Sequence, residues 1–174
     1  MTDYFEFYGL PLSFHPDAAA IKQQFYAFSK KYHPDFHINE SEEKQAEVLE
    51  LSTLNNKAYQ LLSDPQKRLQ YVLELKGLIT EGEHYVLPQS FLMEMMEVNE
   101  ALMDLEFDAD EEKLSTLKSE IDDIENGLSA ELMSLTSDFE SLSANAQHNV
   151  LLAIKDLYYR NKYLLRIREN LSKK

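Results

Sequence analysis

The sequence predicts an all-α protein, and three observations carry that prediction. The 174 residues include only 4 glycines and 5 prolines, too few turn formers for a sheet with frequent hairpins. Apolar residues recur at helical spacing through most of the chain. Residues with helix-capping chemistry stand where these periodic segments begin. The length suits one medium domain or two small ones packed together.

Residues 1–76 form the first predicted unit. A short helix over residues 3–8 opens it, and Gly9 ends this helix because glycine adopts a left-handed conformation at little cost. Asp17 is placed to cap a second helix, and Pro34 stops it because proline disfavours helix at the residue before it. The apolar face of the second helix is formed by Ile21, Phe25, Phe28 and Tyr32.

A polar loop to about Asn39 leads to a long third helix, which we expect to run antiparallel to the second. Apolar residues mark this helix at Val48, Leu51, Leu54, Ala58 and Leu61. Asp64 then caps a fourth helix with Pro65 in its first turn, over residues 66–75. Gly77 ends that helix and the unit.

Residues 77–87 are predicted to be a linker, because they contain Gly82 and no sustained period. Residues 88–174 are predicted to form a three-helix bundle, with helices over about 88–106, 110–136 and 144–171. The connections between them are short enough for antiparallel neighbours. Gly127 is the weak point inside the second of these helices.

Composition excludes several classes of protein and site. The chain has no cysteine, which excludes disulfides, Cys-ligated zinc or iron–sulfur clusters, and Cys nucleophiles. No apolar stretch approaches the roughly 18 residues of a membrane span. The first residues contain neither a basic signal region nor an Arg-rich presequence, so we expect a cytoplasmic protein without a membrane partner.

Charge is unevenly distributed along the chain. Lys and Arg total 17 against 31 Asp and Glu, for a net charge of −14, which disfavours nucleic acid as a partner and favours a basic one. Residues 81–140 hold 18 acids and 2 bases, whereas residues 155–174 hold 7 bases and 2 acids. We expect the basic stretch to complement the acidic helices internally.

The tripeptide His33-Pro34-Asp35 follows Lys30-Lys31-Tyr32 and falls in the loop between the two antiparallel helices. A second copy of the tripeptide, at residues 15–17, precedes the helix that begins after Asp17. There, proline followed by an aspartate cap is ordinary helix-start chemistry. The loop copy is therefore the candidate functional site.

The first unit resembles a J-domain. The matching segments occur in family order: Asp3-Tyr4-Phe5, Tyr8-Gly9-Leu10, the tripeptide at 33–35, Leu54-Asn55-Asn56-Lys57-Ala58-Tyr59 and Asp64-Pro65-Gln66-Lys67-Arg68. In that family the tripeptide docks on a DnaK-type chaperone and stimulates its ATP hydrolysis. The resemblance implies that a DnaK/HscA-type chaperone is bound by His33, Pro34 and Asp35, and that this docking is steered by Lys22, Lys30 and Lys31.

The residues after the tripeptide depart from the common family pattern. Many members carry Lys there, whereas this chain has Phe36-His37, a difference that concerns the local contacts and not the hairpin. His33 and His37 have the spacing of a metal-binding pair, but Pro34 breaks the helix that would align them. We therefore predict neither a metal site nor a cofactor.

The first bundle helix has two sets of apolar residues. A narrow stripe suffices for packing: Phe91, Met95, Val98, Leu102 and Leu105. A second set lies off that stripe among acidic residues: Leu92, Met93, Met96 and Met103. Either neighbouring helices cover this second set, or it is an adaptable partner site, for which methionine is well suited.

Phe91-Leu92-Met93-Glu94 and the three-helix pattern that follows extend the resemblance to the whole chain, which is similar to the HscB-type J-domain co-chaperones of iron–sulfur cluster assembly. In that family the matching positions bind the cluster scaffold IscU. The resemblance implies that IscU is bound by Leu92, Met93, Met96, Glu97, Glu100 and Asp104, with Tyr159 on the last helix. Met96 and Asp104 stand where Leu and Glu are more usual.

Three functions compete. The sequence predicts a co-chaperone that has no active site of its own and regulates a partner's ATPase. A general helical adaptor would keep the acidic bundle face but have an inert first unit. An enzyme is disfavoured, because the sequence has no glycine-rich phosphate loop, nucleophile signature or metal-ligand cluster, and Asp122 and Asp123 face different directions on a helix.

Overall fold

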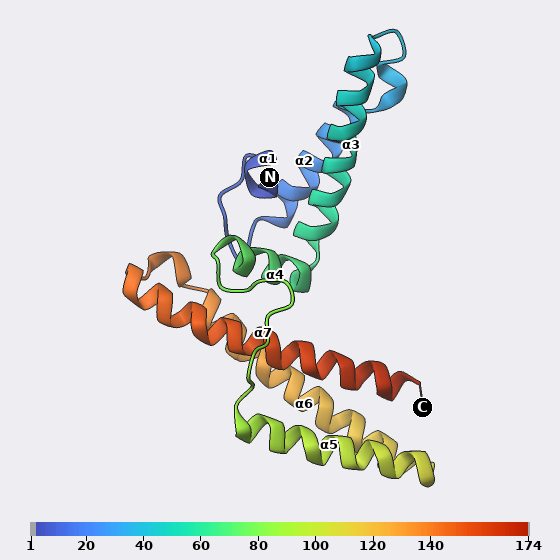
Figure 1. Cartoon of the computed structure of the whole chain (residues 1–174), viewed down its shortest axis with the longest axis vertical. Helices are drawn as coiled ribbons and strands as arrows, with labels where there is room; N and C mark the ends of the chain where they lie inside the picture. Colours follow the sequence, from blue (N-terminus) through green and yellow to red (C-terminus); the bar gives the residue numbers. More distant parts are fainter. Residues whose placement is uncertain (1–2, 174) are drawn as a thin grey trace. The chain divides into compact units, whose positions relative to one another are not determined.

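The computed structural model describes residues 3–173. These residues form α-helices that are connected by loops and short 3₁₀ turns (Figure 1). No strand occurs among these residues, so the all-α prediction is confirmed. The chain divides into two compact units, Met1–Lys76 and Gly77–Lys174. None of the helices in the described part is long and apolar enough to cross a bilayer.

The first unit contains four α-helices and one 3₁₀ turn: α1 (Tyr4–Phe7), α2 (Ala18–Lys31), η1 (Pro34–Phe36), α3 (Glu42–Ser63) and α4 (Pro65–Leu75). The Asp17 carboxylate accepts the Ala19 amide at 2.9 Å, and Asp64 caps α4 in the same way, as predicted. Gly9 and Gly77 have φ angles of +66° and +72°, which confirms both predicted helix ends.

Helices α2 and α3 pack side by side and form the predicted hairpin, with η1 at the end where they are joined (Figure 1). Helix α4 packs against α3. The core of this unit contains Phe5, Tyr8, Phe14, Ile21, Val48, Ala58, Leu62, Leu69, Val72 and Leu73.

The buried face of α3 differs in part from the predicted one. Leu62 and the polar Asn55 are buried, whereas Leu61 is only half-buried. Asn55 accepts a hydrogen bond from the Tyr8 hydroxyl at 2.8 Å and donates to the Phe25 carbonyl at 3.2 Å and the Ser29 hydroxyl at 3.1 Å. These bonds make it possible to bury a polar amide on the inward face of α3, between Val48 and Leu62.

The second unit is a bundle of three α-helices: α5 (Gln89–Phe107), α6 (Glu111–Thr136) and α7 (Ala144–Ser172). Each boundary lies within one residue of the predicted one, and Gly127 does not interrupt α6. The connection before α7 also contains a 3₁₀ turn, η2 (Phe139–Ser141), with Phe139 buried. That turn was not predicted.

The bundle core confirms the narrow stripe on α5. All five of its residues are buried and pack against apolar residues of α6 and α7. Met95 is fully buried, as is Ile121 of α6. Because the stripe already fills the contact with the neighbouring helices, the second apolar set on α5 faces elsewhere.

Candidate functional site

The tripeptide at 33–35 forms an exposed and locally braced turn. His33 caps η1, and its Nδ1 accepts the Asp35 backbone N–H at 3.2 Å. Pro34 occupies the first position of the turn, where its fixed φ fits and no amide hydrogen is needed. The Asp35 side chain is 85 % exposed, and its Oδ2 lies 3.8 Å from the His33 ring. The turn therefore presents a carboxylate to solvent in a preset geometry.

His37 connects this turn to the end of α2. Its Nε2 donates a hydrogen bond to the Lys31 carbonyl at 2.9 Å, which satisfies one of the orphan acceptors at a helix C-terminus. Phe36, beside it, is 68 % exposed and its ring lies 5.6 Å from that of His33. No group of three His, Cys, Asp or Glu side chains within residues 3–173 is arranged to hold a metal ion.

The three candidate lysines of α2 are all exposed, and none of them forms an ion pair within the described part of the chain. Lys22 and Lys31 are nine residues apart, about two and a half helical turns, so they leave opposite sides of α2. Lys30 lies nearer in angle to Lys22. The structure therefore distributes these charges around the helix and does not gather them on one face.

The other copy of the tripeptide lies at the start of α2. Asp17 caps that helix, and the neighbouring Phe14 is buried, with its carbonyl accepting the Arg68 Nε–H at 3.1 Å. Burial lowers the pKa of the Arg68 guanidinium from its ordinary value. In this copy, Asp17 caps the start of α2, as the sequence predicted.

The second apolar set on α5 is largely uncovered. Met93, Met96 and Met103 are about 60 % exposed each, whereas Leu92 is half-buried. The candidate acids beside them are exposed and form no ion pair with any described residue: Glu97, Glu100 and Asp104. An apolar face bordered by free carboxylates is a surface suited to a partner with apolar and basic groups.

The segment before α5 is bound to α7. Glu83 accepts hydrogen bonds from Lys155 at 2.6 Å and from the Tyr159 hydroxyl at 2.8 Å. Tyr85 stacks on Tyr159 with ring centroids 4.5 Å apart and donates to Asp156 at 2.7 Å. These contacts hold residues 83–85 of the predicted linker against the bundle.

The same contacts shift three pKa values. The bonds from Lys155 and Tyr159 lower the pKa of the Glu83 carboxyl. Burial, followed by the bond to Asp156, raises the pKa of Tyr85 to about 12. Burial and the bond to Glu83 raise the pKa of the Tyr159 hydroxyl as well. Both tyrosines therefore stay neutral donors at physiological pH.

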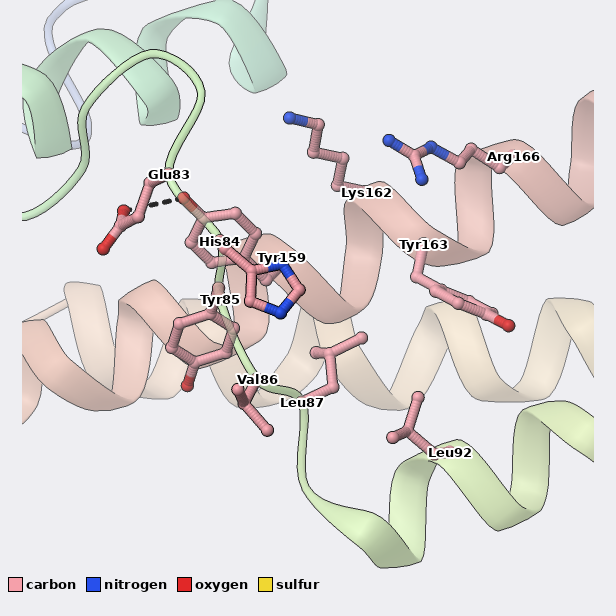
Figure 2. A pocket seen from close by; sticks show the side chains of 10 residues that line it. All are labelled: Glu83, His84, Tyr85, Val86, Leu87, Leu92, Tyr159, Lys162, Tyr163 and Arg166. Atoms are coloured by element: carbon pink, nitrogen blue, oxygen red, sulfur yellow. Dashed lines mark hydrogen bonds between the residues drawn. The ribbon is translucent and has the colours of Figure 1, made fainter.

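A cavity of about 440 Å³ opens beside this network (Figure 2). Leu92 of α5 and Tyr159 of α7 both line it, so the structure brings together two candidate residues that are far apart in the sequence. The remaining lining comes from the segment before α5 and from α7: Glu83, His84, Tyr85, Val86, Leu87, Lys162, Tyr163 and Arg166.

Comparison with known proteins matches both units to families. A DnaJ domain model matches residues 3–71, and a model described as the HSCB C-terminal oligomerisation domain matches residues 87–172. A protein of Chromobacterium violaceum named "Co-chaperone protein HscB homolog" is 36 % identical over 133 residues, which cover 75 % of this chain and 76 % of that protein. The chain belongs to the HscB family of J-domain co-chaperones.

Two solved HscB structures have the same fold. "Chaperone HscB from Vibrio cholerae" aligns with a TM-score of 0.71 and 28 % identity, covering 99 % of this chain and 96 % of that one. "Crystal structure of human co-chaperone protein HscB" aligns with a TM-score of 0.77 and 26 % identity, covering 99 % and 81 %. A Vibrio cholerae relative named as an HscB homolog is 38 % identical over 111 residues, which span 65 % of its own length.

Apart from Leu92 and Tyr159, the residues that line the cavity of this HscB family member are not among those predicted from the sequence. The sequence predicts a linker at Glu83 and Tyr85, and pairing of Lys162 and Arg166 with the acidic helices. One signal was available, because Tyr159, Lys162, Tyr163 and Arg166 follow the i, i+3, i+4, i+7 spacing of a single helix face. No sequence signal indicates that residues 83–85 pack on that face.

Proposed function

We propose that this protein binds a DnaK/HscA-type chaperone through the turn at His33-Pro34-Asp35 and stimulates its ATPase. The observation that carries this proposal is the position of the tripeptide: exposed, braced, and at the end of a helical hairpin in an HscB family member. The reaction belongs to the phosphate site of the chaperone, so this protein acts as a regulator and not as an enzyme.

The proposed mechanism is a shift between conformations of the chaperone. A partner accelerates turnover when it binds the hydrolysis-competent conformation more tightly than the resting one. The exposed Asp35 carboxylate is available to an arginine of the chaperone, and the fixed backbone of Pro34 reduces the entropy lost on docking. Lys22, Lys30 and Lys31 steer the encounter with an acidic patch.

The second part of the proposal concerns the face of α5 formed by Leu92, Met93, Met96, Glu97, Glu100 and Asp104, here called the α5 face. We propose that it binds the iron–sulfur cluster scaffold IscU and delivers it to the chaperone, assisting maturation of iron–sulfur proteins. The exposed methionines supply area to bury, and the acids supply orientation and association rate. Tyr159 contributes through the cavity that it shares with Leu92.

The first test is steady-state ATP hydrolysis by a DnaK/HscA-type chaperone, measured with and without this protein and IscU. The wild type is expected to raise the rate, and IscU to raise it further. His33→Gln is expected to return the rate to that of the chaperone alone, because the brace of the turn and its docking surface are lost. His15→Gln is the matched control and is expected to stimulate like the wild type.

Stimulation that survives in His33→Gln but disappears in His15→Gln would contradict the assignment of the two copies. No stimulation by folded wild-type protein with its cognate chaperone would contradict the co-chaperone proposal and leave a helical adaptor.

The α5 face is tested by calorimetric titration of IscU into the Leu92→Ala/Met96→Ala double variant. Each buried apolar side chain of this size contributes about 1.5–3 kcal/mol, so we expect binding to weaken at least about tenfold. Helical content is expected to stay unchanged. The matched control is Leu152→Ala/Met133→Ala, which truncates the same residue types at exposed positions on α7 and α6. If the Leu92→Ala/Met96→Ala variant binds IscU as tightly as the control variant does, the α5 face is removed from the proposal.

A further inference from the structure

Two basic side chains that line the cavity in Figure 2 have no acidic partner among the described residues. Lys162 and Arg166 lie one turn apart on α7, and both are exposed. Neither forms an ion pair with any of the described residues, although Lys155, Arg160 and Arg168 of the same helix all do. The expected pairing of the basic stretch with the acidic helices is therefore confirmed for Arg168, which pairs with Asp122 of α6, and is wrong for Lys162 and Arg166. Lys155 pairs instead with Glu83 in the segment before α5, and Arg160 pairs with Asp156 of α7 itself.

The cavity also offers an apolar wall. Val86 is 77 % exposed, and Leu92 and Tyr163 are half-buried. The Lys162 Nζ lies 5.9 Å from the centre of the Tyr159 ring, so a cation lies close to the aromatic part of this wall. An entering group thus meets apolar surface and positive charge side by side.

The wall is preformed. The stacked rings of Tyr85 and Tyr159 and the bonds from Glu83 and Tyr85 to α7 hold the segment before α5 in place. A binding surface that is already ordered loses less conformational entropy when its partner docks.

The single acid that lines the cavity does not compete for a ligand's charge. Glu83 already accepts two hydrogen bonds, one of them from the Lys155 ammonium at 2.6 Å. A carboxylate that enters between Lys162 and Arg166 therefore meets two cations that no described carboxylate neutralises. Lys162 and Arg166 thus form a small positively charged surface beside the acidic α5 face.

We infer that the cavity receives an acidic side chain of the scaffold protein, one that neighbours an apolar side chain on the scaffold surface; this inference rests on the proposed function. The carboxylate pairs with Lys162 and Arg166, and its apolar neighbour packs on Leu92 and Val86. The acids of the α5 face pair with basic groups of the scaffold, whereas the cations of the cavity pair with an acidic one. The interface therefore has two charged regions of opposite sign. Such an arrangement admits one orientation of the scaffold and penalises the reverse one.

The test titrates IscU into the 174-residue chain at low and high salt. Lys162→Gln/Arg166→Gln is expected to weaken binding about tenfold at low salt and to reduce the dependence of affinity on salt. The matched control is Lys118→Gln/Lys173→Gln, which removes the same charge from exposed positions that do not line the cavity. It is expected to bind like the wild type.

A charge exchange identifies the scaffold group. The Lys162→Glu/Arg166→Glu variant of this chain is expected to regain binding when one Asp or Glu of the scaffold is changed to Lys. Rescue by none of the scaffold acids would overturn the inference, because a specific carboxylate is its central claim.

The outcomes for the two proposals are distinct. If Leu92→Ala/Met96→Ala weakens binding but Lys162→Gln/Arg166→Gln retains wild-type affinity and salt dependence, the inference is wrong and the proposed function stands. If the folded wild type does not bind the scaffold, both are wrong.

Discussion

At the residue scale, Glu83 shows how one side chain positions a surface. Its carboxylate takes hydrogen bonds from Lys155 and Tyr159, and these bonds lower its pKa from the ordinary value of 4.5. A carboxyl with a lowered pKa in the folded state stabilises the fold at any pH above its ordinary value. That contribution is lost as pH falls through the lowered pKa, because the proton removes the charge that the two donors stabilise.

The prediction concerns the melting temperature of Glu83→Gln. The variant is expected to melt below the wild type at pH 7, and the difference is expected to shrink as pH falls below the Glu83 pKa. Thermal unfolding followed by circular dichroism between pH 7 and pH 3 measures this difference. Glu81→Gln is the control, because exposed Glu81 has no ion pair among the described residues. A difference that stays constant over this pH range would contradict the role of the Glu83 charge.

Adjacent residues in α5 show what periodicity predicts at this scale. Met95 is fully buried and Met96 is 61 % exposed, as expected from their angles around the helix. Asn55 was not predicted as a core residue, because its burial depends on hydrogen bonds with Tyr8, which follows α1, and with Phe25 of α2. A helical period identifies the side that faces inward, but it does not identify a hydrogen-bond partner from another helix.

At the element scale, α6 tests how local propensity relates to stability. Gly127 lies inside this 26-residue helix, is exposed, and has no positive φ. A Cβ placed there would meet no heavy atom within 4 Å. The neighbouring turns and the packed face of α6 therefore override the weak propensity of glycine, which is why the helix continues.

Gly127→Ala is expected to stabilise the protein by about 0.5–1 kcal/mol, because alanine restricts the unfolded chain and costs nothing in the helix. Denaturant unfolding monitored by circular dichroism measures the change. Gly77→Ala is the matched control: its Cβ also meets nothing, but φ is +72°, so we expect destabilisation of about 1–2 kcal/mol. Destabilisation by Gly127→Ala would show a constraint in α6 that its geometry does not reveal.

Helix boundaries were predicted well because their signals are local. Asp17, Asp64 and Gly77 act within one turn of the helix end that they determine. The turn η2 was missed for the opposite reason. Phe139 anchors it by burial against other elements, and a connection of that length carries no period to indicate this.

At the scale of the whole molecule, the two units have separate cores. Buried residues of the first unit come from α1 to α4 and from the segment between α1 and α2, and the bundle core is formed by α5, α6 and α7. The proposed functions divide in the same way, with the chaperone turn in one unit and the α5 face in the other.

A fragment of residues 1–76 is therefore expected to stimulate the chaperone's ATPase without the further increase produced by IscU. The same ATP hydrolysis assay compares the fragment with the full chain, each with and without IscU. The fragment carrying His33→Gln is the control and is expected to be inactive. An increase with IscU in the fragment would contradict the assignment of scaffold binding to the bundle.

The sequence by itself determined the helices, their ends, the position of the tripeptide between α2 and α3, and the side of α5 that faces the core. These follow from local chemistry: capping, proline and glycine geometry, and the helical period. Only the tertiary structure decided that Glu83 and Tyr85 pack on α7, that Leu92 and Tyr159 share a cavity, and that Lys162 and Arg166 have no acidic partner within residues 3–173. Each of these depends on which side chains of different elements come into contact. Because these residues are far apart in the sequence, no local pattern indicates that they meet.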